Sequence, residues 1–390
     1  MKNSILLGLA FAAMVLTSCG EDGTSDIVIN VNGETGTVDS NAIELNGSYS
    51  ESLTLDASQE YIVTGPVIFE SGTTLTIPAG MTIAAAATGA DVYVAIAQGA
   101  KIIAEGTSNQ PIIFTSASNA PNAGNWGGLI LLGKAPINSV DGVTTTIATS
   151  EIASLSYGGT ASDDNSGILR YVRVEYSGGK ADGQSENNGI SFYGVGNATV
   201  VEYIQVFEGK DDGVEFFGGT VNVNYVAVVN AQDDSLDWTE GYTGSITNAY
   251  VKHGATHDKG IEGDGYNTDV ANNGGYFSKP TVTNLTIVGL GSGTENEAIR
   301  LRAGTQGLFT NVWLQGFAEG FDLDGDQSNN PTGAGVLSGD LNVSSVIFDD
   351  VTVNLKNDTG ESFTEADFLT VDPNAKGTDF ATWGAGWTRQ

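Results

Sequence analysis

The sequence predicts an all-β fold, a single-stranded right-handed parallel β-helix, in which short strands wind into a solenoid of stacked coils. Short apolar runs recur at a nearly constant spacing, 53 of the 390 residues are glycine, and no window after the first residues shows sustained helical periodicity. A repeat of this length cannot bury its own apolar face, so stacked copies must supply a continuous core. Parallel crossovers are right-handed as a rule. A set of β-sandwiches is the alternative, but it gives no reason for a coil-length period.

The first 18 residues have the features of a lipoprotein signal peptide. Lys2 precedes an apolar run from Ile5 to Leu16 that is too short to cross a bilayer and is flanked like a secretion signal. The run ends in LTSC at Cys19, which resembles the bacterial lipobox. This resemblance implies lipidation of Cys19 and attachment of a soluble domain to the outer membrane. The acidic residues behind Cys19 resemble the surface-export signal of Bacteroidota lipoproteins, which implies a cell-surface location. An ordinary signal peptide followed by an unrelated cysteine is the alternative.

The rest of the chain divides into three parts. Residues 19–58 are predicted to form a lipidated tether with N-terminal strands, 59–355 the parallel β-helix, and 356–390 a C-terminal cap. A cap is expected because an open β-helix end exposes unpaired strand edges. Equivalent positions in the β-helix recur after about one coil; Tyr203 and Tyr225, for example, are 22 residues apart. The aligned repeats are ILRYVRV, VVEYIQV, NVNYVAV, SITNAYV, TVTNLTI, LFTNVWL and NVSSVIF.

One position of these repeats carries tyrosine, asparagine or serine in every coil. Asn248, Asn284 and Asn311 occupy it in three of them. Parallel stacking in register brings equivalent side chains together at about 4.8 Å per coil. We therefore predict a buried asparagine ladder at one turn of each coil, where the amides satisfy backbone groups.

The charge of the chain excludes some classes of partner. With 15 basic and 47 acidic residues, the formal net charge is −32. Nucleic-acid binding needs lysine and arginine to displace counterions from phosphates, so no nucleic-acid partner is expected. The same charge disfavours electrostatic attachment to an anionic membrane surface. It suits calcium and uncharged or cationic partners.

Two stretches repeat their acids in the same register, DDGVEFFGG from Asp211 and DDSLDWTEG from Asp233. Alternate residues of a strand point outwards, so Glu215 and Asp237 belong to one outer column. The first interpretation is a solvated and partly salt-bridged outer face. The second is calcium, because Ca²⁺ takes several carboxylate oxygens. The candidate calcium ligands are Asp211, Asp212, Glu215, Asp233, Asp234 and Asp237.

The outer columns continue into the neighbouring coils and define a candidate ligand-binding face. Counting coil by coil places acids and two arginines after Asp237 on the same side of the solenoid. Two aromatic residues are expected to lie exposed beside the acids, where they could stack on a sugar ring. The candidate face comprises Phe217, Tyr242, Glu262, Asp264, Arg300, Arg302, Asp322 and Asp324.

Catalysis is the third interpretation of the acidic face. β-helix polysaccharide hydrolases resemble this chain in fold, and they place acids on the outer face with a histidine and a basic residue on later coils. Two carboxylates could act as acid and base in glycoside cleavage, whereas a lyase would use Ca²⁺ and a basic residue. The glycine before the histidine is missing here, and the charge repels polyuronates unless calcium bridges them. The candidate catalytic residues are Asp233, Asp234, Asp237, His253 and Arg300.

Three longer stretches, GNWGGLILLGKAPIN, YGGTASDDNSGILRYVRVEYSGG and GKDDGVEFFGGTVNVNYVAVVNAQDDSLDWTEGYTGSI, carry a family resemblance. They resemble surface lipoproteins of Bacteroidota with a right-handed parallel β-helix domain of pectin-lyase-like shape. The resemblance covers roughly residues 60–320 and implies the fold and the location. We therefore expect a lipoprotein anchored to the outer membrane, whose acidic face binds a glycan or a partner protein in adhesion or nutrient capture. The alternative is a polysaccharide lyase or glycoside hydrolase acting on that face.

Overall fold

The computed structural model describes most of the chain after the N-terminal segment. The described residues are 28–31, 34–37, 41–140, 146–180, 187–294, 297–325 and 331–390. The predicted signal peptide and Cys19 lie outside these ranges. Within them, no helix has the length and apolar character that crossing a membrane requires.

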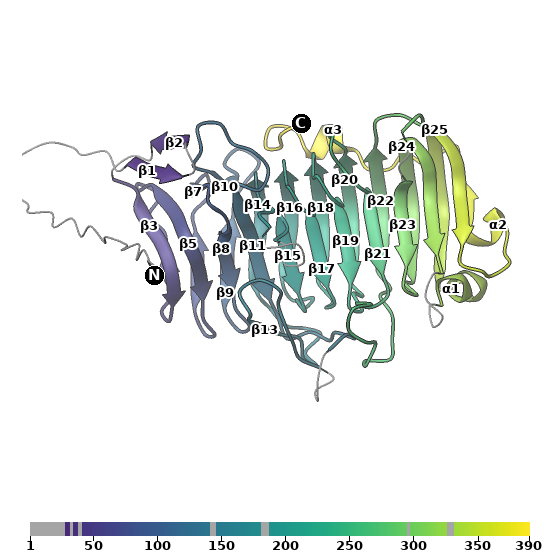
Figure 1. The fold of residues 1–390 in the computed structure, drawn as a ribbon, viewed down its shortest axis with the longest axis horizontal. Coiled ribbons are helices and arrows are strands. Elements are labelled where there is room, and N and C mark those ends of the chain that lie inside the picture. The colour runs from purple at the N-terminus through teal and green to yellow at the C-terminus, as the bar shows by residue number, and fades with distance from the viewer. Residues whose placement is uncertain are drawn as a thin grey trace, which may run out of the picture.

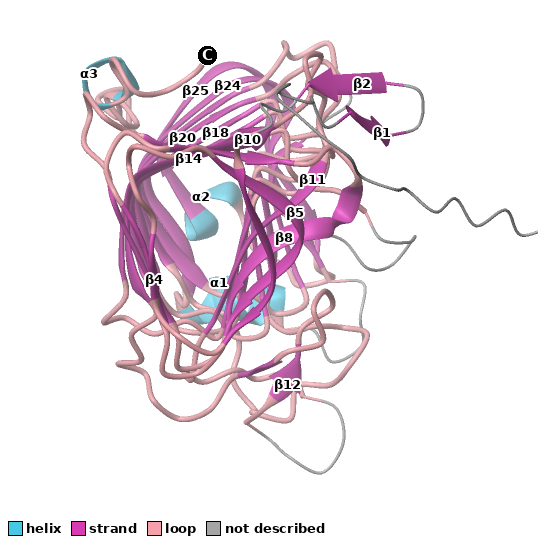
Figure 2. Cartoon of the chain, turned by 90° about the vertical axis from the view of Figure 1, so that its left-hand side faces the viewer, coloured by secondary structure: helices cyan, strands magenta, loops and turns pink. Residues whose placement is uncertain are grey.

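The structure confirms the predicted right-handed parallel β-helix. In the described residues a single sheet of 22 strands coils about the long axis of the molecule, and the strands between its two ends pair with their equivalents in the preceding and following coils (Figure 1). Seen from the N-terminal end, the strands form a closed outline around the interior, and α1 and α2 lie across the far end (Figure 2). The repeat period seen in the sequence is therefore the length of one coil.

The coils are built from strands with the following bounds. The N-terminal coils contain β3 (Ile43–Tyr49), β4 (Leu53–Thr54), β5 (Tyr61–Phe69), β6 (Thr74–Ile77), β7 (Thr82–Ala85), β8 (Gly89–Ile96), β9 (Lys101–Glu105), β10 (Ile112–Ser116) and β11 (Trp126–Leu132). The long strands of the central coils are β14 (Gly167–Glu175), β16 (Val200–Phe207), β18 (Asn222–Val229), β20 (Ser245–Lys252) and β22 (Thr281–Val288). The short strands that alternate with them are β15 (Ile190–Tyr193), β17 (Val214–Phe217), β19 (Leu236–Thr239), β21 (Ile261–Asp264) and β23 (Glu297–Arg302).

The remaining elements close the molecule or lie outside the main sheet. The last coils contain β24 (Gly307–Asp324), β25 (Leu341–Asp358) and β26 (Leu369–Val371). Two small antiparallel pairs are β1 (Val28–Val31) with β2 (Glu34–Thr37) and β12 (Ala148–Thr149) with β13 (Ser156–Tyr157). The short helices are α1 (Thr332–Ser338), α2 (Glu365–Phe368) and α3 (Phe380–Trp383).

The long strands bend at the position that carries tyrosine or asparagine. Tyr203 has a φ of 54° and Asn248 a φ of 58°, both in the left-handed region, which asparagine tolerates better than most residues. The predicted asparagine ladder is present at this bend. Nδ2 of Asn284 donates to Oδ1 of Asn248 at 2.9 Å, and Nδ2 of Asn311 donates to Oδ1 of Asn284 at 2.7 Å. These side chains are half-buried, not fully buried as predicted.

Apolar side chains from every coil fill the interior of the solenoid. In β17, Val214 and Phe216 point inwards and are buried, and Leu236 and Trp238 repeat the arrangement in β19. The residues between them point outwards. Burial of a continuous apolar core is the main stabilising contribution to a fold whose single coils could not be stable alone.

The segment 356–390, predicted to cap the last coil, contains two different structures. α2 lies across the C-terminal end, where Phe368 is fully buried in the core. Residues 372–390, which we call the C-terminal strap, run back along the outside of the long strands (Figure 1). Near the end of the strap, Trp387 packs edge-on against Tyr171 of β14, with ring centroids 5.4 Å apart. The segment thus places α2 at the end of the solenoid and the strap along its side.

Candidate functional site

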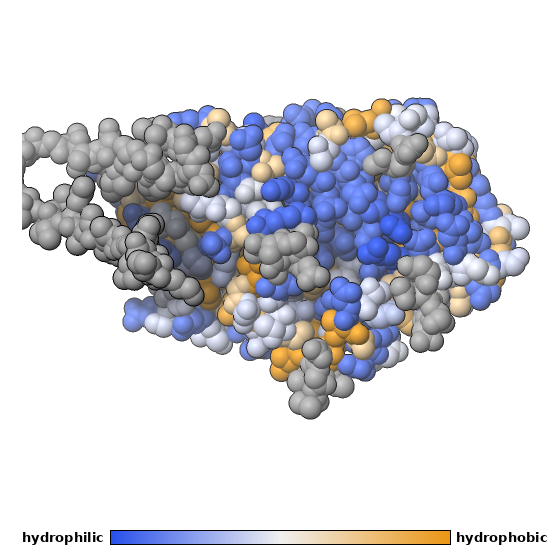
Figure 3. Space-filling model, in the orientation of Figure 1, coloured by the Kyte–Doolittle hydropathy of each residue, from blue (hydrophilic) through white to orange (hydrophobic). Residues whose placement is uncertain are grey.

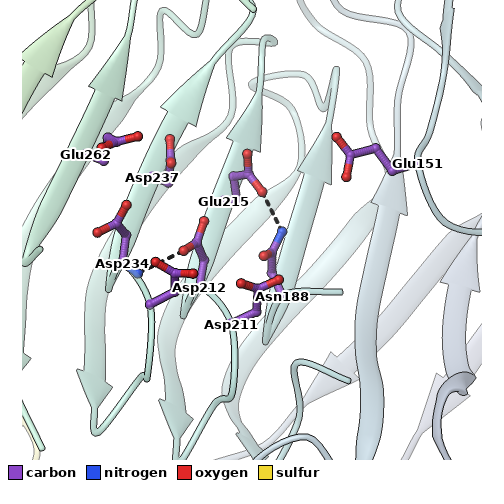
Figure 4. A pocket seen from close by; sticks show the side chains of 9 residues that line it. Glu151, Asn188, Asp211, Asp212, Glu215, Asp234, Asp237 and Glu262 are labelled. Atoms are coloured by element: carbon purple, nitrogen blue, oxygen red, sulfur yellow. Dashed lines mark hydrogen bonds between the residues drawn. The ribbon is translucent and has the colours of Figure 1, made fainter. Parts of the chain in front are cut away.

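An acidic pocket lies on the outer face of β17, β19 and β21, within the hydrophilic area that covers this side of the molecule (Figure 3). Glu215, Asp237 and Glu262 are consecutive partners in the register of these strands. Stacking therefore places three carboxylates in one file, about 4.8 Å from coil to coil. The pocket has a volume of about 260 Å³ and is lined by Glu151, Asn188, Asp211, Asp212, Glu215, Asp233, Asp234, Asp237 and Glu262 (Figure 4).

The turns that precede these strands supply the other carboxylates. Oδ1 of Asp212 accepts the backbone N–H of Asp234 at 2.9 Å, and Oδ1 of Asp234 accepts the backbone N–H of Lys259 at 2.7 Å. Each turn side chain is thus fixed by the equivalent residue of the next coil. The residue after Asp212 is Gly213. A Cβ atom at this position would lie 2.5 Å from the carbonyl oxygen of Ser235, so only glycine fits there.

Basic residues border the acidic pocket. Lys259 occupies the turn position of Asp234 one coil later, and its Nζ lies 3.2 Å from Oε1 of Glu262. Arg302 forms a second ion pair with Glu262. On the opposite side, Nζ of Lys180 lies 3.3 Å from Oδ1 of Asp211. The positive charges are therefore concentrated at the margins of the pocket.

Burial and repulsion act together on the central carboxylates. Glu215 accepts a hydrogen bond from Nδ2 of Asn188 at 2.6 Å, and its partner in the next coil is the carboxylate of Asp237. Burial first, and repulsion by neighbouring acids second, raise the pKa of Glu215 and Asp237 well above the usual range. The same causes raise the pKa of Asp212 and Asp234. The charged forms of these groups are unfavourable unless a cation joins them.

The carboxylate oxygens converge closely enough to coordinate cations. Within each of four overlapping groups, one oxygen per residue lies within 4.8 Å of the others. The groups are Asp212, Glu215 and Asp237; Asp234, Asp237 and Glu262; Asp211, Asp212 and Asp233; and Asp233, Asp234 and Asp258. All the donors are oxygen atoms, which suits Ca²⁺. The residues present therefore fit this ion, and every candidate calcium ligand identified in the sequence belongs to one of the groups.

The solvated outer face expected in the first interpretation is found only in part. Glu215 and Asp237 point outwards and keep only part of their surface accessible, as the strand alternation predicts. Asp212, Asp234 and Glu262 are buried. Their side chains lie against the equivalent residues of adjacent coils, so the stack itself removes them from water.

Both aromatic residues that were expected to be exposed beside the acids are buried. Phe217 stacks on Tyr193 with ring centroids 4.0 Å apart, in a cluster formed with the segment that joins β11 to β14. Tyr242 stacks on Phe216 at 4.4 Å, and its hydroxyl donates to the carbonyl oxygen of Val221 at 2.9 Å. The prediction of an exposed sugar platform is therefore wrong for both residues. The segment between β11 and β14 covers Phe217, and Tyr242 belongs to the hydrophobic core.

The candidate catalytic residues do not meet at one place. His253 is only 3% exposed and stacks on His257, with ring centroids 4.2 Å apart. Burial lowers the pKa of His253 to about 3, so the ring is neutral at physiological pH. Arg300 lines a neighbouring pocket, where its Nε donates to Asp324 at 2.7 Å. The carboxylates of the set converge, but its histidine does not line the acidic pocket.

The other residues of the predicted ligand face form ion pairs on the same side of the solenoid. Arg302 donates from Nε to Oδ1 of Asp264 at 2.6 Å. One coil further on, Asp322 is the register partner of Arg300, and its carboxylate accepts a hydrogen bond from Lys356 at 3.0 Å. The face therefore changes along the axis from a file of acids with basic residues at its margins to alternating charges.

Some residues that line the acidic pocket were not identified from the sequence. Asn188 precedes β15 as Asp212 and Asp234 precede β17 and β19, so the turn repeat predicts its place in the pocket. Lys259 holds the same turn position before β21 and borders the pocket without lining it. Glu151 comes from the segment between β11 and β14, which has no periodic signal.

Comparison with known proteins agrees with this architecture. The chain matches the family model of the pectate-lyase-like β-helix domain over residues 47–388. Comparison with curated proteins gives no match. The family match includes all the central coils and the acidic pocket. Because it extends over most of the sequence, the chain belongs to the family of proteins with a pectate-lyase-like β-helix domain.

Proposed function

We propose that this protein is a cell-surface lipoprotein, anchored to the outer membrane through Cys19, whose acidic pocket holds Ca²⁺ and through it binds a glycan. The observation that carries the proposal is the consecutive stacking of Glu215, Asp237 and Glu262 in one file. Three adjacent carboxylates repel one another, and a divalent cation relieves that repulsion. A partner protein at the same face is the alternative ligand.

The residues around the file have distinct roles in this proposal. Asp237 belongs to two of the convergent groups and is placed to share its carboxylate between neighbouring cations. Asp212 and Asp234 are held in position by backbone N–H groups of the next coil, so they are preorganised as ligands. Lys259 follows Asp212 and Asp234 in the equivalent turn position and places a positive charge at the end of the row. The bound cation would supply the positive charge to which anionic groups of a glycan attach.

Titration calorimetry with Ca²⁺ tests the metal site. We expect saturable binding and a higher melting temperature with Ca²⁺ than with EDTA. Asp237→Asn should weaken binding by about tenfold or more, because it removes a charge shared by two groups of ligands. Asp349→Asn is the matched control, since Asp349 is exposed on β25 and lines neither pocket. Equal Ca²⁺ affinity of the wild type and Asp237→Asn would exclude the site.

The ligand is tested on a glycan array in the presence of Ca²⁺ and of EDTA. Binding of acidic glycans that is lost with EDTA supports the proposal. Calcium-dependent capture of a surface protein, with no glycan signal, would identify the alternative ligand.

Anchoring is tested in cells that produce the full chain. Wild-type protein should fractionate with the outer membrane and be degraded by protease added to intact cells. Cys19→Ala should release it from the membrane fraction, because the acyl chains provide the attachment. Retention of the variant in the outer membrane would contradict lipid anchoring.

A polysaccharide lyase or glycoside hydrolase remains the second candidate function. It is favoured by the family of the β-helix domain and by the convergence of Asp233, Asp234 and Asp237. Assays for unsaturated products and for new reducing ends on a panel of polysaccharides decide the matter. An enzyme should give products that are lost in Asp234→Asn, whereas a binding protein gives none with either chain.

A further inference from the structure

The file of outward-facing side chains that contains Glu215 continues in both directions along the solenoid. Towards the N-terminus, the register partners of Glu215 are Ser191 and then Ile130, and each is only 2% exposed. Towards the C-terminus, the file continues through charged residues, which are Asp237, Glu262, Arg300, Asp322 and Lys356. The file therefore changes at Glu215 from buried uncharged side chains to charged ones.

A separate part of the chain buries the file before Glu215. The described part of the connection between β11 and β14, residues 134–140 and 146–157, packs on the outer face of the strands; we call it the covering segment. Its Ile137 and Ile152 belong to one hydrophobic cluster with Ile130 of β11. Phe217 of β17 lies in the same cluster. Burial of these apolar side chains holds the covering segment against the solenoid.

Buried hydrogen bonds also attach the covering segment. The hydroxyl of Tyr157 donates to Oε2 of Glu240 at 2.7 Å, and Nδ2 of Asn138 donates to the carbonyl oxygen of Gly265 at 2.8 Å. Glu240 follows β19 and Gly265 follows β21, so the segment is attached to coils that supply acids of the pocket. Buried hydrogen bonds are costly to break, because the separated groups lose their partners. The covering segment is therefore a fixed boundary of the acidic pocket.

The covering segment limits the acidic pocket at one end of the file. Its Glu151 lines the pocket, and Glu215 lies between Glu151 and Asp237 (Figure 4). At the other end the file continues past Glu262 to Arg300, which stays partly exposed. The hydrophilic surface extends in this direction towards the C-terminal coils (Figure 3). A long ligand can therefore leave the pocket towards the C-terminal coils, whereas the covering segment obstructs it towards the N-terminal coils.

We propose that the acidic pocket binds the terminal sugar of an acidic glycan chain and not a sugar inside the chain. The inference rests on the proposed calcium-dependent glycan binding and adds which part of the glycan is recognised. The terminal sugar lies beside the Ca²⁺ and meets the covering segment at Glu151, and the following sugars lie along the file. Lys356 is four coils beyond Asp237, about 19 Å at the usual strand spacing, so several sugars fit there. A chain that continued in both directions would collide with the covering segment.

Calorimetry with end-modified oligosaccharides tests the inference on the full chain in Ca²⁺. The probes are decagalacturonate, the same chain with aminobenzamide at the reducing end, the same chain with a benzyl ether at the non-reducing end, and the chain with both groups. We expect one single modification to weaken binding by about tenfold or more, because the added group clashes with the boundary of the pocket. The other modification should have little effect, because that end projects beyond the pocket. Equal affinities of the unmodified and doubly modified chains would overturn the inference.

A variant of the boundary shows where the clash occurs. Glu151 is exposed, so Glu151→Ala leaves the fold intact and makes room at the end of the pocket. The ratio of the affinities for the unmodified chain and for the chain modified at the recognised end should fall from about tenfold or more towards equality. Asp349→Asn, far from the boundary on β25, should keep the ratio of the wild type. An unchanged ratio in Glu151→Ala would mean that the covering segment does not select the chain end.

Two results separate this inference from the proposed function. Calcium-dependent binding that is lost in Asp237→Asn but is insensitive to both end modifications would overturn the recognition of a chain end and support the proposed function. Failure of all the galacturonate probes and of the acidic glycans of the array in Ca²⁺ would overturn both.

Discussion

Glu215 of β17 and Asp237 of β19 are direct register partners, one coil apart on the outer face of the solenoid. Burial and mutual repulsion raise the pKa of both carboxyls. The charged forms of two acids in this position are unfavourable unless a cation joins them. The relationship between these two side chains is therefore the basis of the proposed calcium site, and it has a consequence for stability.

Neutralising Asp237 should stabilise the metal-free protein. Asp237→Asn removes repulsion from Glu215 and Glu262, its partners on either side. We expect the free energy of unfolding in EDTA to rise by about 1 kcal/mol, measured by urea denaturation. With saturating Ca²⁺ the wild type should be more stable than Asp237→Asn, because it binds the ion more tightly and gains more free energy of unfolding from it. A variant less stable than wild type in EDTA would contradict the repulsion argument.

Glu240 should make stability depend on pH near neutrality. Its carboxylate accepts hydrogen bonds from the hydroxyl of Tyr157 at 2.7 Å and from Asn267 at 3.3 Å, yet burial raises its pKa to about 7. The pKa of Glu240 is about 7 in the folded protein and about 4.5 in the unfolded chain. Its protonated form therefore adds to the free energy of unfolding below pH 4.5, and this contribution is lost as the pH rises through about 7. The loss amounts to about 3 kcal/mol.

Glu240→Gln tests this pH dependence. The amide keeps the size of the side chain but does not titrate. We expect the melting temperature of the wild type in EDTA to fall more steeply between mildly acidic and mildly alkaline pH than that of the variant. Identical slopes for the two proteins would show that Glu240 does not titrate in this range.

The asparagine ladder should contribute to stability through two separable effects. Asn284 both accepts from Asn311 and donates to Asn248, and its φ is 57°. Asn284→Ala loses both amide contacts and places alanine in a left-handed conformation, so we expect a loss of about 2 to 3 kcal/mol in urea denaturation. Asn284→Gly also loses both amide contacts, but glycine adopts a positive φ without strain. We therefore expect Asn284→Gly to be about 1 kcal/mol more stable than Asn284→Ala. Equal stability of the two variants would show that strain plays no part.

The C-terminal strap should stabilise the coils that it crosses. Trp387 is 1% exposed, and the backbone carbonyl of the same residue accepts a hydrogen bond from Arg173 of β14. We expect Trp387→Ala to lower the free energy of unfolding by about 3 kcal/mol, the usual loss for a large buried side chain. Lys376→Ala is the control within the strap, because the Lys376 side chain is exposed and only its backbone N–H bonds to Asn311. Unchanged stability of Trp387→Ala would mean that the strap contributes little.

Much of the acidic pocket could be predicted because the fold converts a linear period into spatial proximity. Residues 22 positions apart, such as Glu215 and Asp237, must become neighbours once coils stack in register. The turn residues Asp212 and Asp234 follow the same rule. Lys259 also follows it, but its coil carries a basic residue where the two preceding coils carry an acid.

The amino-acid sequence by itself determined the parallel β-helix, the register of its coils and the convergence of the acids, because these depend on a repeat that every coil obeys. The tertiary structure alone decided which outward-facing residues stay accessible. A connection without a period covers Phe217, and the C-terminal strap turns back along the coils. His253 is buried and does not line the acidic pocket. Such contacts join segments with no common repeat, so they depend on packing that no local pattern encodes.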